Sequence, residues 1–164
     1  MTEDLGKRLK NLVGTRSLKE GIREQSEIDQ YLANAADLQG DAESAKTILG
    51  RFTLAYEGIH CVAMAVLNHL GVRPGDGEGH RTVALQVAVD ALRMSEDDPN
   101  ANRVLSHLHD TRNRKIYRQP LPPVTKNLAD NAAVFLRRML PLARAETCLD
   151  PDQEANQDPG SKGP

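Results

Sequence analysis

Two apolar stripes that run side by side along residues 42–70 constrain the fold of this 164-residue chain more than any other feature. The residues of both stripes recur at intervals of three and four: Ile48, Phe52, Ala55, Ile59, Val62, Val66 and Leu70, then Ala45, Leu49, Tyr56, Ala63 and Leu67. This spacing is that of an α-helix, and an apolar face of this width is typical of the central helix of a bundle. Gly71, followed by Pro74, is expected to end the helix.

Further apolar stripes at helical spacing predict helices at 27–38, 80–93 and 99–118, and a last helix that begins after Thr125. Gly40 is expected to break the first of these. Asp41 is then expected to cap the helix of 42–70, because its carboxylate can accept hydrogen bonds from free backbone N–H groups. The glycine-rich residues 71–79 lack the GxxxxGK[ST] pattern of a phosphate-binding loop and predict a flexible connection.

These segments predict an all-α protein, a four-to-five-helix up-and-down bundle. Aromatic residues are scarce, with no Trp, two Phe and three Tyr, so packed helices are favoured over a sheet. Residues 1–26 are interpreted as an N-terminal arm or a short helix, 27–146 as the bundle, and 147–164 as a disordered tail. The tail contains too few apolar residues to offset its ordering entropy.

Several classes of protein are disfavoured by the sequence. Cys61 and Cys148 form no CxxC motif, and His60 and His69 lie too far apart along their helix to chelate a metal together, so neither a metal nor a cofactor is expected. No N-terminal apolar run resembles a signal peptide, and no segment approaches the roughly 18–20 apolar residues of a membrane span. These features favour a cytoplasmic protein with reduced thiols and no membrane partner.

Positive charge gathers in residues 112–118, although the net charge of the whole chain is −2. Arg112, Arg114, Lys115 and Arg118 are cationic, and no residue of this segment is acidic. His109, Asn113 and Tyr117 lie four residues apart and therefore share one face of the predicted helix. A short basic cluster with an Arg-Asn pair and a phenol suits RNA or phosphate better than a protein core.

The arrangement of these motifs resembles the HEPN superfamily, whose members are small helical bundles with roles related to nucleotides or RNA. Three features, within residues 45–145, carry the resemblance. The first is the helix Ala55-Tyr56-Glu57-Gly58-Ile59-His60, which leads through Leu67-Asn68-His69-Leu70-Gly71 to Gly79-His80-Arg81. The second is the apolar helix that follows. The third is Arg112-Asn113 near the end of a long helix, with Tyr117 after it.

The resemblance implies an RNA-binding protein or a metal-independent endoribonuclease, acting as a toxin or a phage-defence component. Active members usually have a His where this chain has Tyr117, and a phenol exchanges protons poorly near neutral pH. The expected catalytic residues are Arg112, Asn113, His109 and Tyr117. Of these, Arg112 is suited to stabilise the charge of a phosphorane. Arg114, Lys115 and Arg118 are the expected RNA-binding residues. The family's paired motifs also imply a homodimer.

Other functions remain open from the sequence. The basic cluster could instead be a solvated helix end, where cations are favoured by the helix dipole. The chain could be a non-catalytic interaction module that partners an antitoxin, a nucleotidyltransferase or a larger complex. In that case two surfaces would carry contacts, the N-terminal stripe of Leu5, Leu9 and Leu12 and the tail. A third alternative is a bundle that encloses a small molecule between the helices of 42–70 and 80–93.

Overall fold

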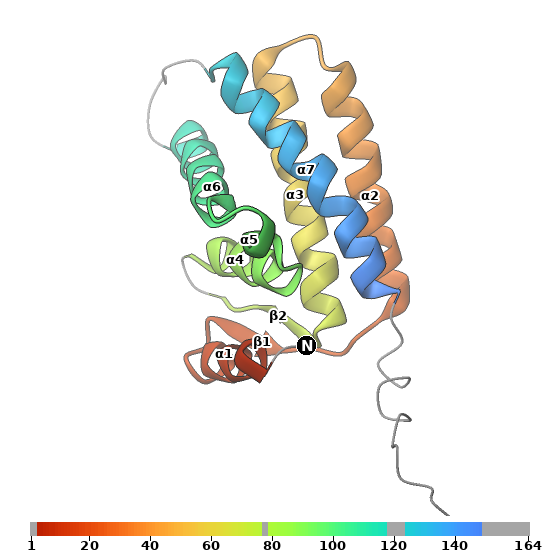
Figure 1. Cartoon of the computed structure of the whole chain (residues 1–164), viewed down its shortest axis with the longest axis vertical. Helices are drawn as coiled ribbons and strands as arrows, with labels where there is room; N and C mark the ends of the chain where they lie inside the picture. The colour runs from red at the N-terminus through yellow and green to blue at the C-terminus, as the bar shows by residue number, and fades with distance from the viewer. Residues whose placement is uncertain (1–2, 77–78, 118–123, 149–164) are drawn as a thin grey trace, which may run out of the picture.

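The computed structural model describes residues 3–76, 79–117 and 124–148, and of residues 114–117 it describes the backbone alone. The elements are α1 (Glu3–Gly14), β1 (Leu18–Glu20), α2 (Gln25–Ser44), α3 (Ile48–His69), β2 (Val72–Pro74), α4 (His80–Ala91), α5 (Met94–Asp97), α6 (Ala101–Tyr117) and α7 (Lys126–Thr147), as Figure 1 shows. Most of the described chain is helical, so the predicted all-α bundle is confirmed.

Helix α3 lies at the centre of the fold and packs against the two other long helices, α2 and α7 (Figure 1). Phe52, Tyr56 and Ile59 of α3 are fully buried, as their stripes predict. Helices α2 and α3 run up and down, joined by a short turn. Helix α7 runs in the same direction as α3, and Arg51 and Asp130, near the first turns of these two helices, form an ion pair at 3.1 Å.

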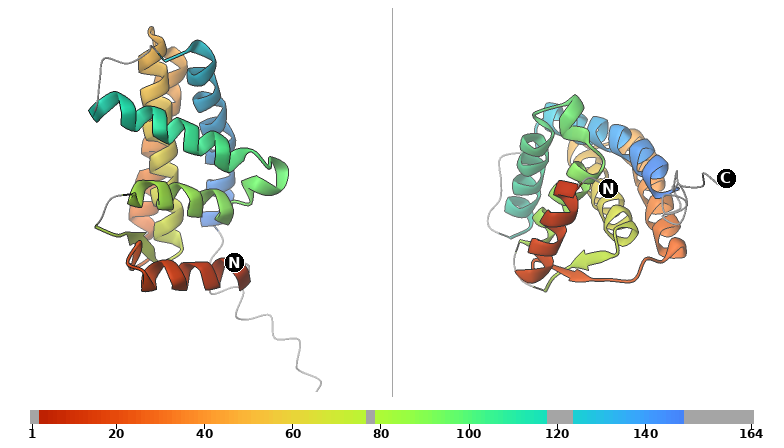
Figure 2. Two further views of the ribbon diagram at one scale, coloured as in Figure 1. Left: turned by 90° about the vertical axis from the view of Figure 1, so that its left-hand side faces the viewer. Right: turned by 60° about the horizontal axis from the view of Figure 1, so that its bottom comes forward.

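Helices α6, α4 and α1 lie one below another across the three long helices (Figure 2). Helix α4 is the apolar helix that residues 80–93 predict, and half of its residues are buried. Helix α6 contributes Leu105 and Leu108 to the same core. This crosswise layer holds α6 beside α3, so polar residues of the two helices can meet.

The predicted boundary between the first two long helices is wrong. Gly40 and Asp41 lie inside α2, which continues to Ser44 and buries Ala42. A single glycine costs a helix only about 1 kcal/mol relative to alanine, so one glycine need not end it. The cap of α3 is Thr47, whose Oγ1 accepts from the Gly50 N–H at 3.0 Å. The predicted cap of the last helix is confirmed, because the Thr125 Oγ1 accepts from the Leu128 N–H at 3.2 Å.

The N-terminal residues form α1 and half of a small sheet. Of the two alternatives for 1–26, the structure shows the helix, with Leu5 and Leu9 buried against the body. Strand β1 pairs antiparallel with β2, with Leu18 opposite Pro74. The sequence predicted only a flexible connection at 71–79. Gly71 adopts a positive φ of 69°, and a Cβ at Gly75 would clash with the Arg16 carbonyl, so these glycines allow a turn and a close approach.

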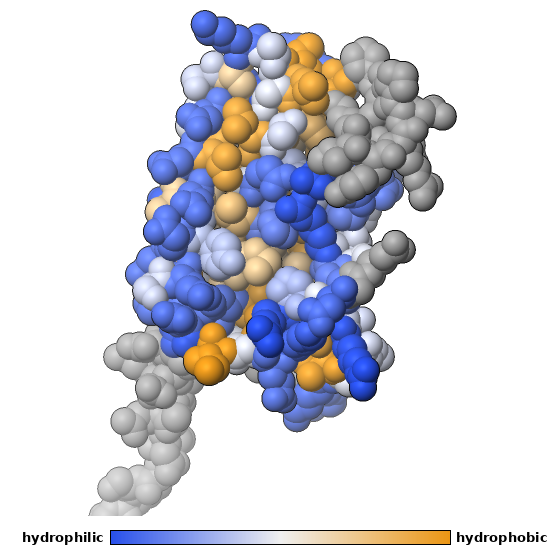
Figure 3. All heavy atoms as spheres, turned by 180° about the vertical axis from the view of Figure 1, so that it is seen from behind, coloured by the Kyte–Doolittle hydropathy of each residue, from blue (hydrophilic) through white to orange (hydrophobic). Residues whose placement is uncertain are grey.

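Several hydrophobic side chains are exposed on the surface of the bundle. On the face seen from behind, hydrophobic residues form a broken strip that runs down from the end where α3 begins (Figure 3). Ile48 and Leu49 are exposed in the first turn of α3, and Leu54 and Cys61 are partly buried farther along it. No helix in the described part of the chain is both long and apolar enough to span a membrane. The predicted tail lies outside the described residues from 149 onward.

The close approach of α3 to α7 depends on Gly58. A Cβ at this position would lie 2.5 Å from Leu136 Cδ2, and Leu136 is fully buried, so its displacement would disturb the core around it. We predict that Gly58→Ala lowers the free energy of unfolding by about 1–3 kcal/mol through overpacking. The control is Gly40→Ala, because nothing lies within 4 Å of the added methyl. It should stabilise the protein by roughly 0.5–1 kcal/mol. Urea denaturation measures both, and equal effects would contradict the prediction.

Candidate functional site

The structure brings three of the predicted site residues, His109, Arg112 and Asn113, to the side of α6 that faces α3. His107, two residues before His109, is exposed on another face of α6. For Tyr117, Arg114 and Lys115 the side chains lie outside the described part of the chain, and Arg118 lies outside it altogether. The described site is therefore built from the last turns of α6 and the middle of α3.

His109 is buried, with 7% of its surface exposed, and protein groups occupy both of its ring nitrogens. Its Nδ1 lies 2.8 Å from the Tyr56 hydroxyl, and its Nε2 lies 2.8 Å from the Asn113 amide nitrogen. With the amide donating to Nε2, the ring carries its proton on Nδ1 and donates to the phenol oxygen. Burial lowers the pKa of His109, so the imidazole is neutral near pH 7.

This geometry changes the role expected of His109. The side chain turns inward, as an acid or base at the site would have to. Neither ring nitrogen, however, is free to exchange a proton with a ligand while Tyr56 and Asn113 hold it. In the described state His109 orients Asn113, and proton transfer through its ring would require the Asn113 amide to move away.

Arg112 is bound to a carboxylate that the sequence interpretation gave no role. Its guanidinium donates to Glu57 Oε1 at 2.9 Å, and Glu57 lies on α3. Arg81, in the first turn of α4, donates to Glu57 Oε2 at 3.2 Å and makes a longer contact of 3.5 Å to Oε1. The three side chains come from three helices and are 21–31% exposed, so solvent reaches them.

Tyr56 lies beneath both arginines. The guanidinium carbons of Arg81 and Arg112 are 5.6 Å and 5.9 Å from the centre of its ring, which is within the range of cation–π attraction. Burial is the main cause that raises the pKa of Tyr56 to about 12, although the two arginines act in the opposite direction. The phenol therefore stays protonated, and its hydroxyl keeps its hydrogen bond to His109.

His60, one turn after Tyr56 on α3, completes the cluster. Its Nδ1 accepts from the Arg81 guanidinium at 3.3 Å. Burial, followed by the positive charge of Arg81, lowers the pKa of His60 to about 4, so this imidazole is neutral near pH 7. We call Tyr56, Glu57, His60, Arg81, His109, Arg112 and Asn113 the α3–α6 cluster.

The sequence interpretation missed Tyr56, Glu57, His60 and Arg81 as site residues. It quoted them within the resemblance but assigned them no chemistry, and it counted Tyr56 among the apolar residues. One signal could have found them. Glu57 is the only carboxylate between Ile48 and His69, and Tyr56 and His60 stand four residues apart beside it. A lone charged residue in the middle of a helix that is otherwise buried needs a partner.

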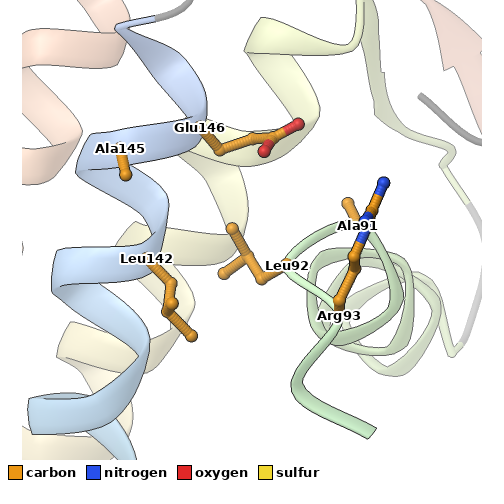
Figure 4. A pocket seen from close by; sticks show the side chains of 6 residues that line it. All are labelled: Ala91, Leu92, Arg93, Leu142, Ala145 and Glu146. Carbon is orange, nitrogen blue, oxygen red and sulfur yellow. The ribbon is translucent and has the colours of Figure 1, made fainter. Parts of the chain in front are cut away.

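Other features of the described chain do not converge on this cluster. A shallow pocket of about 300 Å³ lies between the end of α4 and the last turns of α7. Its lining is mostly apolar, with Arg93 and Glu146 as its charged members, and Leu92 and Leu142 point toward one another across it (Figure 4). It shares no residue with the cluster. Among the described residues, no group of three His, Cys, Asp or Glu side chains could hold a metal ion.

A scan against protein-family models found no match, and comparisons with curated proteins and with solved structures found none either. The resemblance to the HEPN superfamily therefore rests on the residues of this chain alone.

The lowered pKa values predict how stability depends on pH. Below about pH 6.5 the unfolded chain protonates His60, whereas the folded protein does so only near pH 4. The unfolded state binds more protons in this window, so the free energy of unfolding should fall as the pH falls, by on the order of 2 kcal/mol for His60 after allowance for solvent screening. His109 should add to the same slope.

Urea denaturation between pH 7 and pH 4 checks this prediction. The variant His60→Gln should show a shallower fall in stability than the wild type. The matched control His107→Gln, which removes an exposed imidazole of α6, should keep the slope of the wild type. A slope unchanged in His60→Gln would contradict the assignment of His60.

Proposed function

We propose that this chain is an HEPN-like RNA-binding protein whose contact with RNA is centred on Arg112 and Asn113. One observation carries the proposal. Two partly exposed guanidiniums, those of Arg112 and Arg81, converge on a single carboxylate beside the neutral, hydrogen-bonded His109. Arginine is the side chain best suited to phosphate, because its planar fork offers paired donors. Asn113, held by His109, has an amide that can bond to ribose or base.

Metal-independent RNA cleavage is a second proposed function, and His60 favours it. Cleavage requires a group that takes the proton of the 2′-hydroxyl and a charge that stabilises the phosphorane. His60 is neutral and contacts Arg81, so it joins Tyr117 as a candidate for the proton transfer. His109 could take this role only if the Asn113 amide moved away from its Nε2. A ribonuclease of this kind fits a toxin or a phage-defence component that is controlled by an antitoxin or another partner protein.

The alternative of a non-catalytic interaction module loses one of its proposed surfaces. Leu5 and Leu9, which would have carried contacts to a partner, are buried against the chain's own body. A partner of this kind would have to bind elsewhere. An antitoxin or a nucleotidyltransferase remains compatible with RNA binding as a regulator of it.

We include a homodimer in the proposal because an apolar surface adjoins the cluster. Leu54, Glu57 and Cys61 recur at intervals of three and four on α3, so two partly buried apolar side chains and the carboxylate share a face of that helix. Leu49 is 53% exposed and lies eight residues before Glu57, about 12 Å along the helix. A second copy that covered this strip would bring a second cluster close to the first.

Arg112→Ala is predicted to weaken RNA binding about tenfold or more, because a hydrogen bond to a charged group contributes about 1.5–3 kcal/mol. Fluorescence anisotropy with labelled structured and single-stranded RNA, at one fixed salt concentration, measures the affinity. Arg144→Ala, on the exposed side of the last turns of α7, is the matched control and should bind like the wild type. Equal affinity of Arg112→Ala and the wild type would refute the proposal. The same RNAs, without added metal, test for cleavage.

Leu49→Glu is predicted to shift the protein from dimer to monomer, because it places a charge on the apolar strip at its most exposed leucine. A carboxylate is tolerated in the first turn of a helix, so the fold should persist. Light scattering coupled to size exclusion measures the mass. Ile22→Glu, at a side chain that is 90% exposed before α2, is the control. A wild-type protein that is monomeric at high concentration would remove the dimer from the proposal.

A further inference from the structure

We propose that Arg81 and Arg112 together form one oxyanion site, and that Glu57 occupies this site as an internal counter-ion until a phosphate displaces it. The inference rests on the proposed RNA binding for the identity of the ligand, a phosphodiester. It adds Arg81, from another helix, to the contacts of Arg112. It also assigns Glu57 the role of a competitor of the ligand.

The Glu57 carboxylate lies between two guanidinium groups, where a bound anion would lie. One carboxylate oxygen accepts from Arg112 at 2.9 Å, and the other accepts from Arg81 at 3.2 Å. A phosphate presents oxygens in a similar arrangement, and guanidinium groups bind carboxylate and phosphate with the same paired donors. With 31% of its side chain exposed, Glu57 can swing toward solvent without crossing the core.

The local charge favours an anion even while Glu57 is in place. Two guanidiniums face one carboxylate, so a positive charge is left over. Tyr56 and His60, which also contact these arginines, do not cancel it, because both are neutral near pH 7. Arg112 also keeps a donor unused, since its Nε is buried and has no hydrogen-bond partner among the described residues. Glu57 alone therefore does not provide an acceptor for every hydrogen-bond donor of the two arginines.

The arginines are held by contacts that do not involve Glu57. Both guanidiniums lie over the ring of Tyr56, and Arg81 also donates to His60 Nδ1 at 3.3 Å. If Glu57 moves away, these contacts keep the two donors converging on the place it leaves. In a purely structural ion triad, by contrast, the carboxylate would be the only group that holds the two cations together.

Inorganic phosphate is the probe that tests the site directly. It is titrated against chloride at constant ionic strength and pH 7, and the thermal midpoint gives the apparent Kd. Glu57→Gln, which keeps the shape and removes the charge, should bind phosphate at least tenfold more tightly than the wild type. Glu43→Gln is the matched control, because Glu43 is paired with Arg137 at 2.9 Å on another surface and its change alters the net charge equally. It should bind like the wild type.

The double variant Glu57→Gln/Arg81→Gln should lose the gain in affinity, which would show that Arg81 is half of the site. Equal phosphate affinity of Glu57→Gln and Glu43→Gln would overturn the inference. If Glu57→Gln does not fold, the comparison of wild type with Arg81→Gln decides: stabilisation by phosphate that both proteins share overturns the site, and its loss in Arg81→Gln supports it.

The RNA measurements separate this inference from the proposed function. Tighter phosphate binding by Glu57→Gln, with RNA affinity unchanged in Arg112→Ala, would keep the oxyanion site and remove RNA as its ligand. RNA affinity that falls in Arg112→Ala, with no gain for phosphate in Glu57→Gln, would keep RNA binding and overturn the role of Glu57 as a counter-ion.

Discussion

The hydrogen bond between Tyr56 and His109 is the polar contact on which the arrangement of the cluster depends. Tyr56 is fully buried in the middle of α3, and a phenol hydroxyl left without a partner there would cost about 1–3 kcal/mol. His109 supplies the partner from α6, 53 residues later in the chain. The bond fixes the rotation of α6 about its own axis. Arg112 and Asn113 then face α3, at three and four residues beyond His109, because helical spacing leaves them no other direction.

The energetics of the charged residues point away from a purely stabilising role. Half-exposed ion pairs contribute little to folding, and an ion triad is often replaceable by apolar residues without loss. The body of α3 is already stabilised by apolar burial on the sides that face α2 and α7. Two arginines and a glutamate on its remaining side therefore need an explanation other than stability, and an anion-binding surface supplies one.

The sequence predicts those parts of the fold that depend on local periodicity. The double stripe of α3, the apolar α4 and the Thr125 cap are visible because each follows from residues a few positions apart. The crosswise layer cannot be predicted in this way, because periodicity identifies an apolar face but not the helix that covers it. Gly40 misled the prediction because its cost is small beside the burial of a whole helix face.

The same distinction between local and long-range features applies to the candidate site. Arg112, Asn113 and His109 were found because they are neighbours on one helix, whereas Glu57 and Arg81 reach them from α3 and α4. Tyr56 has the spacing of a core residue and is one, so its hydroxyl gave no separate signal. Tyr56 therefore belongs both to the core and to the site. Its ring packs in the core, its hydroxyl is bonded to His109, and the two arginines lie over its π-system.

Because Tyr56 belongs both to the core and to the site, the site is coupled to the packing of α6. The polar contacts of α6 with α3 belong to this cluster, and α6 also packs against α4. A ligand that draws Arg112 away from Glu57 removes one of the ties between α6 and α3 but leaves the bond of His109 to Tyr56 intact. The buried N-terminal half of α6 can therefore stay in place while Arg112 changes its partner.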